Sequence, residues 1–245
     1  MATYVLVHGG SHGGWCYTRL ARLLREADHL VYTPSLTGLA DRKHLLSPAV
    51  DLDTHITDIV NLLEYEDLSD VILAGHSYGG MVITGVADRA LDRVGNLVFL
   101  DAAHPRNGES LADNAPDLMN EARDGMRVID GVELVVFPDS PSMRHMGVED
   151  PDDFAWMVAK ITPHPWKCFT QKLVLEHEDE VRRIHRTSVN CTPIMRMRPE
   201  ATRRRALNAD LLFEIDTGHD LMITEPRAVA DMLLQVAALR ATAQG

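Results

Sequence analysis

The sequence is short of aromatic residues, of cysteine and of long apolar stretches. Phe, Trp and Tyr make up 5% of its 245 residues, and its three cysteines, Cys16, Cys168 and Cys191, lack the spacing of a metal site. Such a sparse, odd set of cysteines argues against a disulfide framework. No apolar run approaches the roughly 18 residues of a membrane helix. We therefore expect neither a disulfide-stapled fold nor a membrane-spanning one.

Net positive charge is also missing, because 24 Lys and Arg oppose 36 Asp and Glu. A chain of formal charge −12 repels nucleic acid and anionic membrane surfaces, since Lys and Arg supply the affinity for both. The residues before the first apolar run are too few and too poor in basic side chains for a signal peptide. We expect a cytoplasmic protein whose partner is a small molecule, not nucleic acid or a membrane; a homodimer stays open.

Apolar runs and helical periodicity alternate along the first hundred residues. Apolar residues at helical spacing indicate helices over 15–28 and 53–66, and short β-branched runs indicate buried strands over 4–7, 30–33, 71–74 and 96–100. This alternation predicts an α/β fold, with a parallel sheet covered by helices on both faces. Loops at the carboxyl ends of such strands gather at one edge of the sheet, so residues far apart in the sequence can share a site there.

The length fits one α/β domain with an insertion better than two independent domains. The alternation weakens over 105–184 and then returns. We expect residues 1–104 and 185–245 to form the core, and 105–184 to form a mostly helical cap that is not an independent domain. The apolar cap residues that are candidates for lining a substrate pocket are Met143, Met146, Phe154, Trp156, Trp166 and Phe169.

The sequence Gly-His-Ser-Tyr-Gly over 75–79 matches the motif G-x-S-x-G. An apolar run precedes it and a helical pattern follows it, which is the context that this motif requires. Small residues two before and two after the serine permit a strained strand-to-helix turn that lifts the hydroxyl into a cleft beside a helix N-terminus. The alternative is a glycine-rich turn with an exposed serine. We interpret Ser77 as a nucleophile.

Two other loops at predicted strand ends would complete a site around this serine. His-Gly-Gly-Ser over 8–11 ends the first strand, and backbone N–H groups there, together with that of Tyr78, would hold an oxyanion. His219 follows the last strand and comes after the serine in chain order, as the base must. No His-Glu-x-x-His spacing suggests a metal. The histidines expected to be structural or pocket-lining are His8, His12, His76 and His104.

Three segments together resemble the hydroxynitrile lyase and plant methylesterase branch of the α/β-hydrolases. They are His-Gly-Gly-Ser-His-Gly-Gly-Trp over 8–15, Gly-His-Ser-Tyr-Gly-Gly over 75–80 and Gly-His-Asp-Leu-Met over 218–222; Ile-Thr-Pro-His-Pro over 161–165 is similar to the branch's cap. The resemblance implies a six-stranded parallel sheet, a helical cap over a mostly apolar pocket, and no cofactor. By position, it implies Ser77 as nucleophile and His219 as base. It places the oxyanion-hole amides on Gly10 and Tyr78.

Two positions favour ester hydrolysis within this branch. Its lyases resemble one another in a polar residue directly after the first-strand histidine, and some have a lysine after the catalytic histidine; this chain has Gly9 and Asp220 there. Glycine leaves the oxyanion hole open, and without a lysine nothing obvious stabilises a departing cyanide. We expect a serine hydrolase that cleaves a small apolar or aromatic carboxylic ester through an acyl-enzyme. The alternatives are a lyase or other cofactor-free carbon–carbon chemistry, and a non-catalytic small-molecule receptor.

The acid that should orient His219 is missing from the position that the resemblance indicates. That position holds Asn190, and the window 188–193 contains no carboxylate. Asp101 follows the strand over 96–100, which should adjoin the strand that bears the serine. Asn190 could orient the imidazole through its amide oxygen but supplies no charge. We expect Asp101 to be the acid, although it could instead shape the strand-end loop, and Asn190 is the alternative.

Overall fold

Six parallel strands form the central sheet, in the order β2-β1-β3-β4-β8-β9. The computed structural model describes residues 1–136 and 146–243. The strands are β1 (Thr3–Val7), β2 (Leu30–Tyr32), β3 (Val71–His76), β4 (Val94–Leu100), β8 (Arg186–Cys191) and β9 (Leu211–Ile215). Each pair of neighbours is parallel. The α/β fold class with six parallel strands is therefore confirmed.

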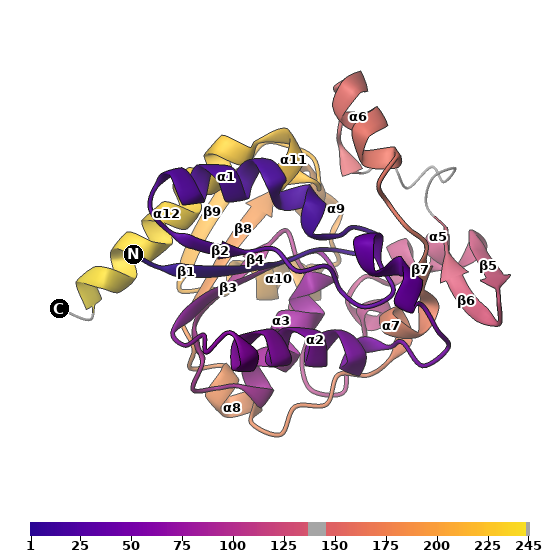
Figure 1. Cartoon of the computed structure of the whole chain (residues 1–245), viewed down its shortest axis with the longest axis horizontal. Coiled ribbons are helices and arrows are strands. Elements are labelled where there is room, and N and C mark those ends of the chain that lie inside the picture. Colours follow the sequence, from indigo (N-terminus) through magenta and orange to yellow (C-terminus); the bar gives the residue numbers. More distant parts are fainter. Residues whose placement is uncertain (137–145, 244–245) are drawn as a thin grey trace.

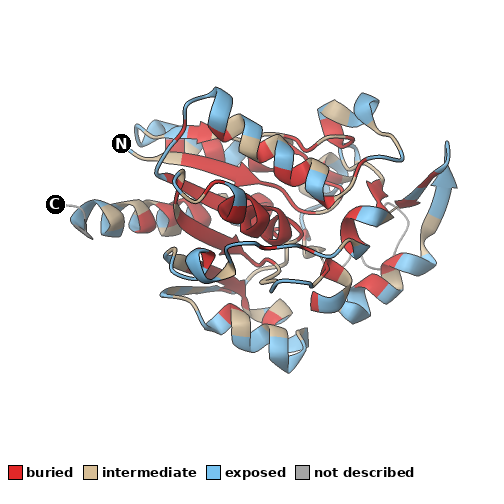
Figure 2. Ribbon diagram, turned by 90° about the horizontal axis from the view of Figure 1, so that it is seen from below, coloured by how far each residue is buried: buried red, intermediate tan, exposed pale blue. Residues whose placement is uncertain are grey.

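Helices cover both faces of this sheet (Figure 1). On one side lie α1 (Thr18–Glu26), α11 (Leu221–Thr224) and α12 (Pro226–Ala243), and on the other lie α2 (Leu52–Tyr65) and α3 (Gly79–Arg89). Every residue of β3 is buried, because both of its faces are covered. Figure 2 shows the buried residues concentrated in the sheet and on the inner sides of the helices. This is why the strands read as continuous apolar runs.

Most of the segment between β4 and β8 lies at the end of the molecule opposite the two termini, and its last helix returns to the core beside α3 (Figure 1). Its elements are α4 (Leu111–Asn114), α5 (Pro116–Asp124), β5 (Met126–Ile129), β6 (Val132–Val135), α6 (Pro151–Val158), β7 (His164–Pro165), α7 (Trp166–Thr170) and α8 (Glu178–Val181). Strands β5, β6 and β7 form an antiparallel sheet. The expectation of a mostly helical segment missed this sheet. Its signal was Asp130-Gly131, where both residues have positive φ, as a two-residue hairpin turn requires.

Four short helices complete the described chain. They are η1 (Gly14–Tyr17), η2 (Ala40–Leu45), α9 (Thr192–Met197) and α10 (Glu200–Leu207). Among the described residues, no helix combines the length and the apolar composition that a membrane crossing needs. The loops that follow β1, β3, β4 and β9 all leave the sheet at the carboxyl ends of parallel strands. They therefore meet at one edge, where ligand sites of open α/β sheets form.

Candidate active site

Ser77 occupies a strained turn between β3 and α3. Its φ is +53°, a left-handed conformation that a non-glycine residue rarely adopts. The turn is tight, because a Cβ on Gly75 would lie 2.6 Å from the Gly79 carbonyl oxygen. A Cβ on Gly79 would in turn lie 2.7 Å from the Val7 carbonyl oxygen. Only glycine fits at both positions. The tight turn holds the serine just before the N-terminus of α3.

His219 and Asp101 come from different strand ends and form a hydrogen bond. His219 follows β9 and Asp101 follows β4, which is the neighbour of β3. His219 Nδ1 lies 2.6 Å from Asp101 Oδ2. Because a carboxylate accepts, Nδ1 carries the proton and Nε2 is left free to act as a base. Asp101 is buried, has a φ of +43° and is anchored by its backbone N–H, which donates to the Val189 carbonyl oxygen at 2.8 Å.

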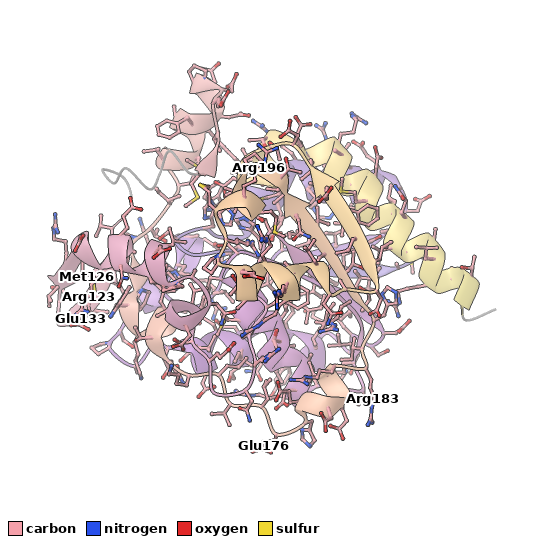
Figure 3. The ribbon with its side chains drawn as sticks, turned by 180° about the vertical axis from the view of Figure 1, so that it is seen from behind. Arg123, Met126, Glu133, Glu176, Arg183 and Arg196 are labelled. Atoms are coloured by element: carbon pink, nitrogen blue, oxygen red, sulfur yellow. The ribbon has the colours of Figure 1, made fainter. Side chains whose placement is uncertain are left out.

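Arg198, which directly follows α9, holds the other side of the same carboxylate. Its Nη2 donates to Asp101 Oδ1 at 2.9 Å, and its Nη1 donates to the Ala102 carbonyl oxygen at 3.0 Å. Burial would raise the pKa of Asp101, but the charge of Arg198 and the hydrogen bond from His219 hold it below its usual value. Sequence analysis missed Arg198, since no motif or periodicity marks it. Arg196, on the same helix, is exposed (Figure 3).

Gly10 and Tyr78 line the same cavity as Ser77. Neither amide N–H has an acceptor among the described residues. Gly9 is enclosed, because a Cβ there would lie 2.7 Å from His76 Nδ1 and 2.9 Å from Ser77 Cβ. A side chain at this position would therefore press on the serine. Two residues that line the cavity of Ser77 thus have unpaired backbone N–H groups.

Asn190 lies apart from this group. Its Nδ2 donates to the Ala206 carbonyl oxygen at 3.4 Å, on α10, and its Oδ1 has no partner among the described residues. The neighbouring Cys191 is the residue of β8 that reaches the loop that bears His219, where its Sγ donates to the Gly218 carbonyl oxygen at 3.0 Å. The structure thus brings His219 to Asp101 and not to Asn190.

A cavity of about 310 Å³ lies above Ser77 and His219. Its apolar lining comes mainly from the segment between β4 and β8 and from α9, and includes Leu111, Ala115, Leu118, Met119, Met146, Phe169, Ile194 and Met197. Only some of the expected pocket residues line the cavity. Met146 and Phe169 line the cavity, whereas Phe154, Trp156 and Trp166 do not, and Met143 lies outside the described residues. Trp156 instead packs edge-on against Trp15, with ring centroids 5.0 Å apart.

Of the histidines expected to be structural or pocket-lining, His8, His12 and His76 are buried and His104 is partly buried. His8 Nε2 accepts the Leu36 N–H at 3.0 Å, and burial lowers the pKa of His8 to about 3. His76 Nε2 donates to the His219 carbonyl oxygen at 2.9 Å. His104 stacks on Phe99 with ring centroids 4.1 Å apart and lines the cavity. Each of these rings therefore fixes a loop of the site or part of its wall.

One cluster has residue types that could bind a metal ion. Ligand atoms of His55, His164 and Cys168 lie within 4.8 Å of one another. However, His164 Nδ1 already accepts the Ser11 N–H at 3.0 Å, so a metal on Nε2 would require a deprotonated imidazolate. His55 is engaged through both nitrogens, by the Thr37 carbonyl oxygen and the Tyr78 hydroxyl, each at 2.9 Å. His164 Nε2 has no hydrogen-bond partner among the described residues, but it carries the proton of the neutral ring, so we assign no metal to this cluster.

Comparison with known proteins finds partial sequence relatives. A carbendazim hydrolyzing esterase from Nocardioides sp. (strain SG-4G) is 57% identical over 111 residues, which is 45% of this chain and 46% of that protein. Putative methylesterase 11, chloroplastic, from Arabidopsis thaliana is 32% identical over 127 residues, 49% of this chain and 33% of that protein. The matched segments thus span less than half of these relatives. The resemblance to plant methylesterases is confirmed.

The fold is shared over the full length. An extracellular alpha/beta-hydrolase from a Paenibacillus species has a TM-score of 0.79 and 25% identity, covering 96% of this chain and 98% of that one. That protein shares structural and functional homology with tobacco salicylic acid binding protein 2. Residues 4–232 match the alpha/beta hydrolase family. With its six-stranded parallel sheet and its serine at the turn after β3, the chain belongs to the alpha/beta hydrolase family.

Proposed function

We propose that the protein is a serine hydrolase that cleaves a small, neutral carboxylic ester through an acyl-enzyme. The observation that carries this proposal is the 2.6 Å hydrogen bond from His219 Nδ1 to Asp101 Oδ2, at the cavity that also holds Ser77. It fixes the tautomer in which His219 Nε2 is the free base, and it stabilises the imidazolium that forms when that nitrogen is protonated. The strained turn at Ser77 supports the same assignment.

The reaction has two acyl-transfer steps. Ser77 Oγ attacks the ester carbonyl carbon as His219 Nε2 takes its proton, and the tetrahedral intermediate collapses when that proton passes to the departing alcohol. Water then attacks the acyl-enzyme, giving its proton to His219, and the acid leaves as Ser77 recovers its proton. The N–H groups of Gly10 and Tyr78 would donate to the oxyanion in both steps, since neither has an acceptor among the described residues.

The cavity supports a neutral, largely apolar substrate. Its lining is mostly aliphatic and methionine side chains. Asp117 and Glu121 also border it and would repel an anion, while the one arginine in the described lining, Arg198, is already paired with Asp101. The names of the partial relatives, a carbendazim hydrolyzing esterase and a methylesterase, support an ester-cleaving activity. Carbendazim and methyl esters therefore belong on the first substrate panel.

The test combines covalent labelling with turnover. Wild-type protein is incubated with a fluorophosphonate probe and with a panel of short-chain and aromatic esters, alongside Ser77→Ala and the exposed control Ser69→Ala. We expect the wild type and Ser69→Ala to be labelled and to turn over esters, and Ser77→Ala to do neither. Turnover that survives Ser77→Ala unchanged would exclude the covalent mechanism.

The same experiment separates the two alternative functions. Release of an aldehyde or ketone without ester turnover would indicate lyase chemistry on this scaffold. Tight binding of a small molecule, with neither turnover nor labelling of Ser77, would indicate a receptor. Gly9 favours the hydrolase over the lyase. The lyases of this branch resemble one another in a polar residue at this position, and such a side chain would here occupy the space beside Ser77.

A further inference from the structure

The peptide between Gly10 and Ser11 is held at both ends by histidine rings. The Gly10 carbonyl oxygen lies 2.8 Å from His12 Nδ1, and the Ser11 N–H donates to His164 Nδ1 at 3.0 Å. A carbonyl only accepts and an amide N–H only donates. His12 Nδ1 must therefore carry a proton, and His164 Nδ1 must lack one. Both rings are buried, so neither water nor salt substitutes for these bonds.

The second nitrogen of His12 also faces an acceptor. Nε2 lies 3.2 Å from Oδ2 of Asp220, the fully buried residue that directly follows His219. His12 Nδ1 faces a carbonyl oxygen and Nε2 faces a carboxyl oxygen. A neutral imidazole has only one N–H, so beside an ionised Asp220 one ring nitrogen and the oxygen opposite it would both be acceptors. The pair therefore holds one additional proton. Burial alone would lower the pKa of His12, but the charge of Asp220 and the hydrogen bonds to Asp220 and Gly10 outweigh it and raise the pKa.

We propose that His12 and Asp220 form a buried imidazolium–carboxylate pair that positions the oxyanion loop, residues 8–13, against the loop of the base. The proposal rests on the function proposed above, because the Gly10 N–H has a role only if attack by Ser77 turns the substrate carbonyl oxygen into an oxyanion. His12 and Asp220 are positioning residues: the pair fixes the peptide that follows Gly10 and ties it to the residue after His219.

Most of the titratable groups that surround the pair are neutral. The titratable groups around it are His8, Cys16, Tyr17, His76, His164 and His219. Burial lowers the pKa values of His8 and His76 to about 3 and that of His164 well below its usual value, so these three rings are neutral. Burial raises the pKa values of Cys16 and Tyr17, so the thiol and the phenol are neutral too. His76 Nε2 comes within 3.8 Å of Asp220 Oδ1 but donates to His219.

Loss of the shared proton would release the loop. At high pH, His12 can keep a proton on Nδ1 for Gly10 or on Nε2 for Asp220, but not on both. Either choice places two acceptors against each other in a buried site, which is unfavourable. We expect an alkaline limb in kcat with little change in KM, because the oxyanion donors act mainly in the transition state.

The test compares Asn and Gln at position 12, because their amide nitrogens lie at different distances from the backbone. In His12→Asn the amide nitrogen takes the place of Nδ1 and can still donate to Gly10, whereas in His12→Gln it takes the place of Nε2 and reaches only Asp220. We expect His12→Gln to lower kcat about tenfold, less than the ~10²–10³-fold cost of removing a direct oxyanion donor, with KM within about twofold. His12→Asn should retain clearly more activity than His12→Gln. The exposed His177→Asn is the matched control.

Two further measurements make the outcome decisive. Asp220→Asn removes the carboxylate but can still hydrogen-bond a neutral His12, so the alkaline limb assigned to the pair should disappear. Nitrogen NMR of histidine-labelled wild type should show both His12 nitrogens protonated at neutral pH. Equal losses in His12→Asn and His12→Gln, an unchanged limb in Asp220→Asn, or an unprotonated His12 nitrogen would each overturn the proposal. If wild type turns over no ester, the proposed function fails, and the NMR result alone decides the charge state of the pair.

Discussion

Arg198 donates to Asp101 Oδ1 at 2.9 Å, the carboxylate oxygen that His219 does not use. One oxygen of the carboxylate is thus held by a permanent charge, which turns the other toward the imidazole. The arginine comes from the segment just after β8, the region where the resemblance places the acid itself. In this chain that region supplies a cation to the carboxylate of Asp101, which follows another strand, β4.

Removal of Arg198 should weaken both the fold and the base. In Arg198→Met the buried Asp101 loses its cation, so burial dominates and its pKa rises. Breaking a buried ion pair by removing one partner costs about 3–5 kcal/mol of unfolding free energy. We expect a lower kcat and an acidic limb of the pH–rate profile that moves to higher pH. Thermal unfolding and kcat against pH are the measurements, with Arg196→Met as the exposed control on the same helix.

The direction of the pH effect follows from the lowered pKa of Asp101. In the wild type, the ionised carboxylate stabilises the fold above the unfolded pKa of about 3.9, and this contribution is lost as pH falls through the lower folded value. In Arg198→Met the neutral acid should persist to higher pH. An acidic limb at the same pH in both proteins would show that Arg198 does not control this carboxylate.

Replacement of the acid should separate Asp101 from Asn190. Asp101→Asn keeps a residue that tolerates positive φ but presents an amide to His219, and loss of a triad carboxylate can lower kcat by about 10⁴-fold. Asn190→Ala removes a side chain bonded to Ala206 and should be milder. Steady-state kinetics on folded proteins would measure both. The reverse ranking would transfer the role to Asn190, and full activity in both would leave another group to orient His219.

A side chain at position 9 should disturb the nucleophile. In Gly9→Ala the new Cβ would lie 2.7 Å from His76 Nδ1 and 2.9 Å from Ser77 Cβ, so the histidine ring or the turn must shift. We expect kcat to fall at least about tenfold, since small misplacements of reacting groups are costly. Gly108→Ala provides a comparison, because nothing lies within 4 Å of its added Cβ, although its φ of +78° adds strain. Equal turnover in Gly9→Ala and wild type would contradict the expected crowding.

Substrate charge should affect the rate of ester turnover. The cavity is lined mainly by apolar side chains, and Asp117 and Glu121 also border it. We expect short-chain and aromatic neutral esters to have higher kcat/KM than carboxylate-bearing analogues of the same length. The matched variant Glu121→Gln should narrow the difference by weakening the repulsion of the anion. A preference of the wild type for a polyanionic ester would overturn the assignment of an apolar pocket.

Local sequence patterns predict much of the architecture. The apolar runs of β1, β3 and β4 predict buried parallel strands, because only such strands bury both faces. The glycines around Ser77 predict the tight turn, since Cβ atoms at positions 75 and 79 would collide with the backbone. Asp130-Gly131 is also a local signal, typical of the turn of a β-hairpin, and it marks the hairpin between β5 and β6. Hydrophobic periodicity alone does not reveal it.

Only the tertiary structure decided which side chains meet. Asp101 and Asn190 both lie at or near strand ends, and no local pattern distinguishes them; the order of strands and the direction of each side chain put Asp101 against His219 and Asn190 against α10. Arg198 is unmarked for the same reason, because its contact with Asp101 spans 97 residues of chain. Local sequence patterns predict the strands of the central sheet, the turn at Ser77, and the order of Ser77 and His219 along the chain. Packing across the sheet edge decided the partners, since long-range contacts depend on where whole elements dock.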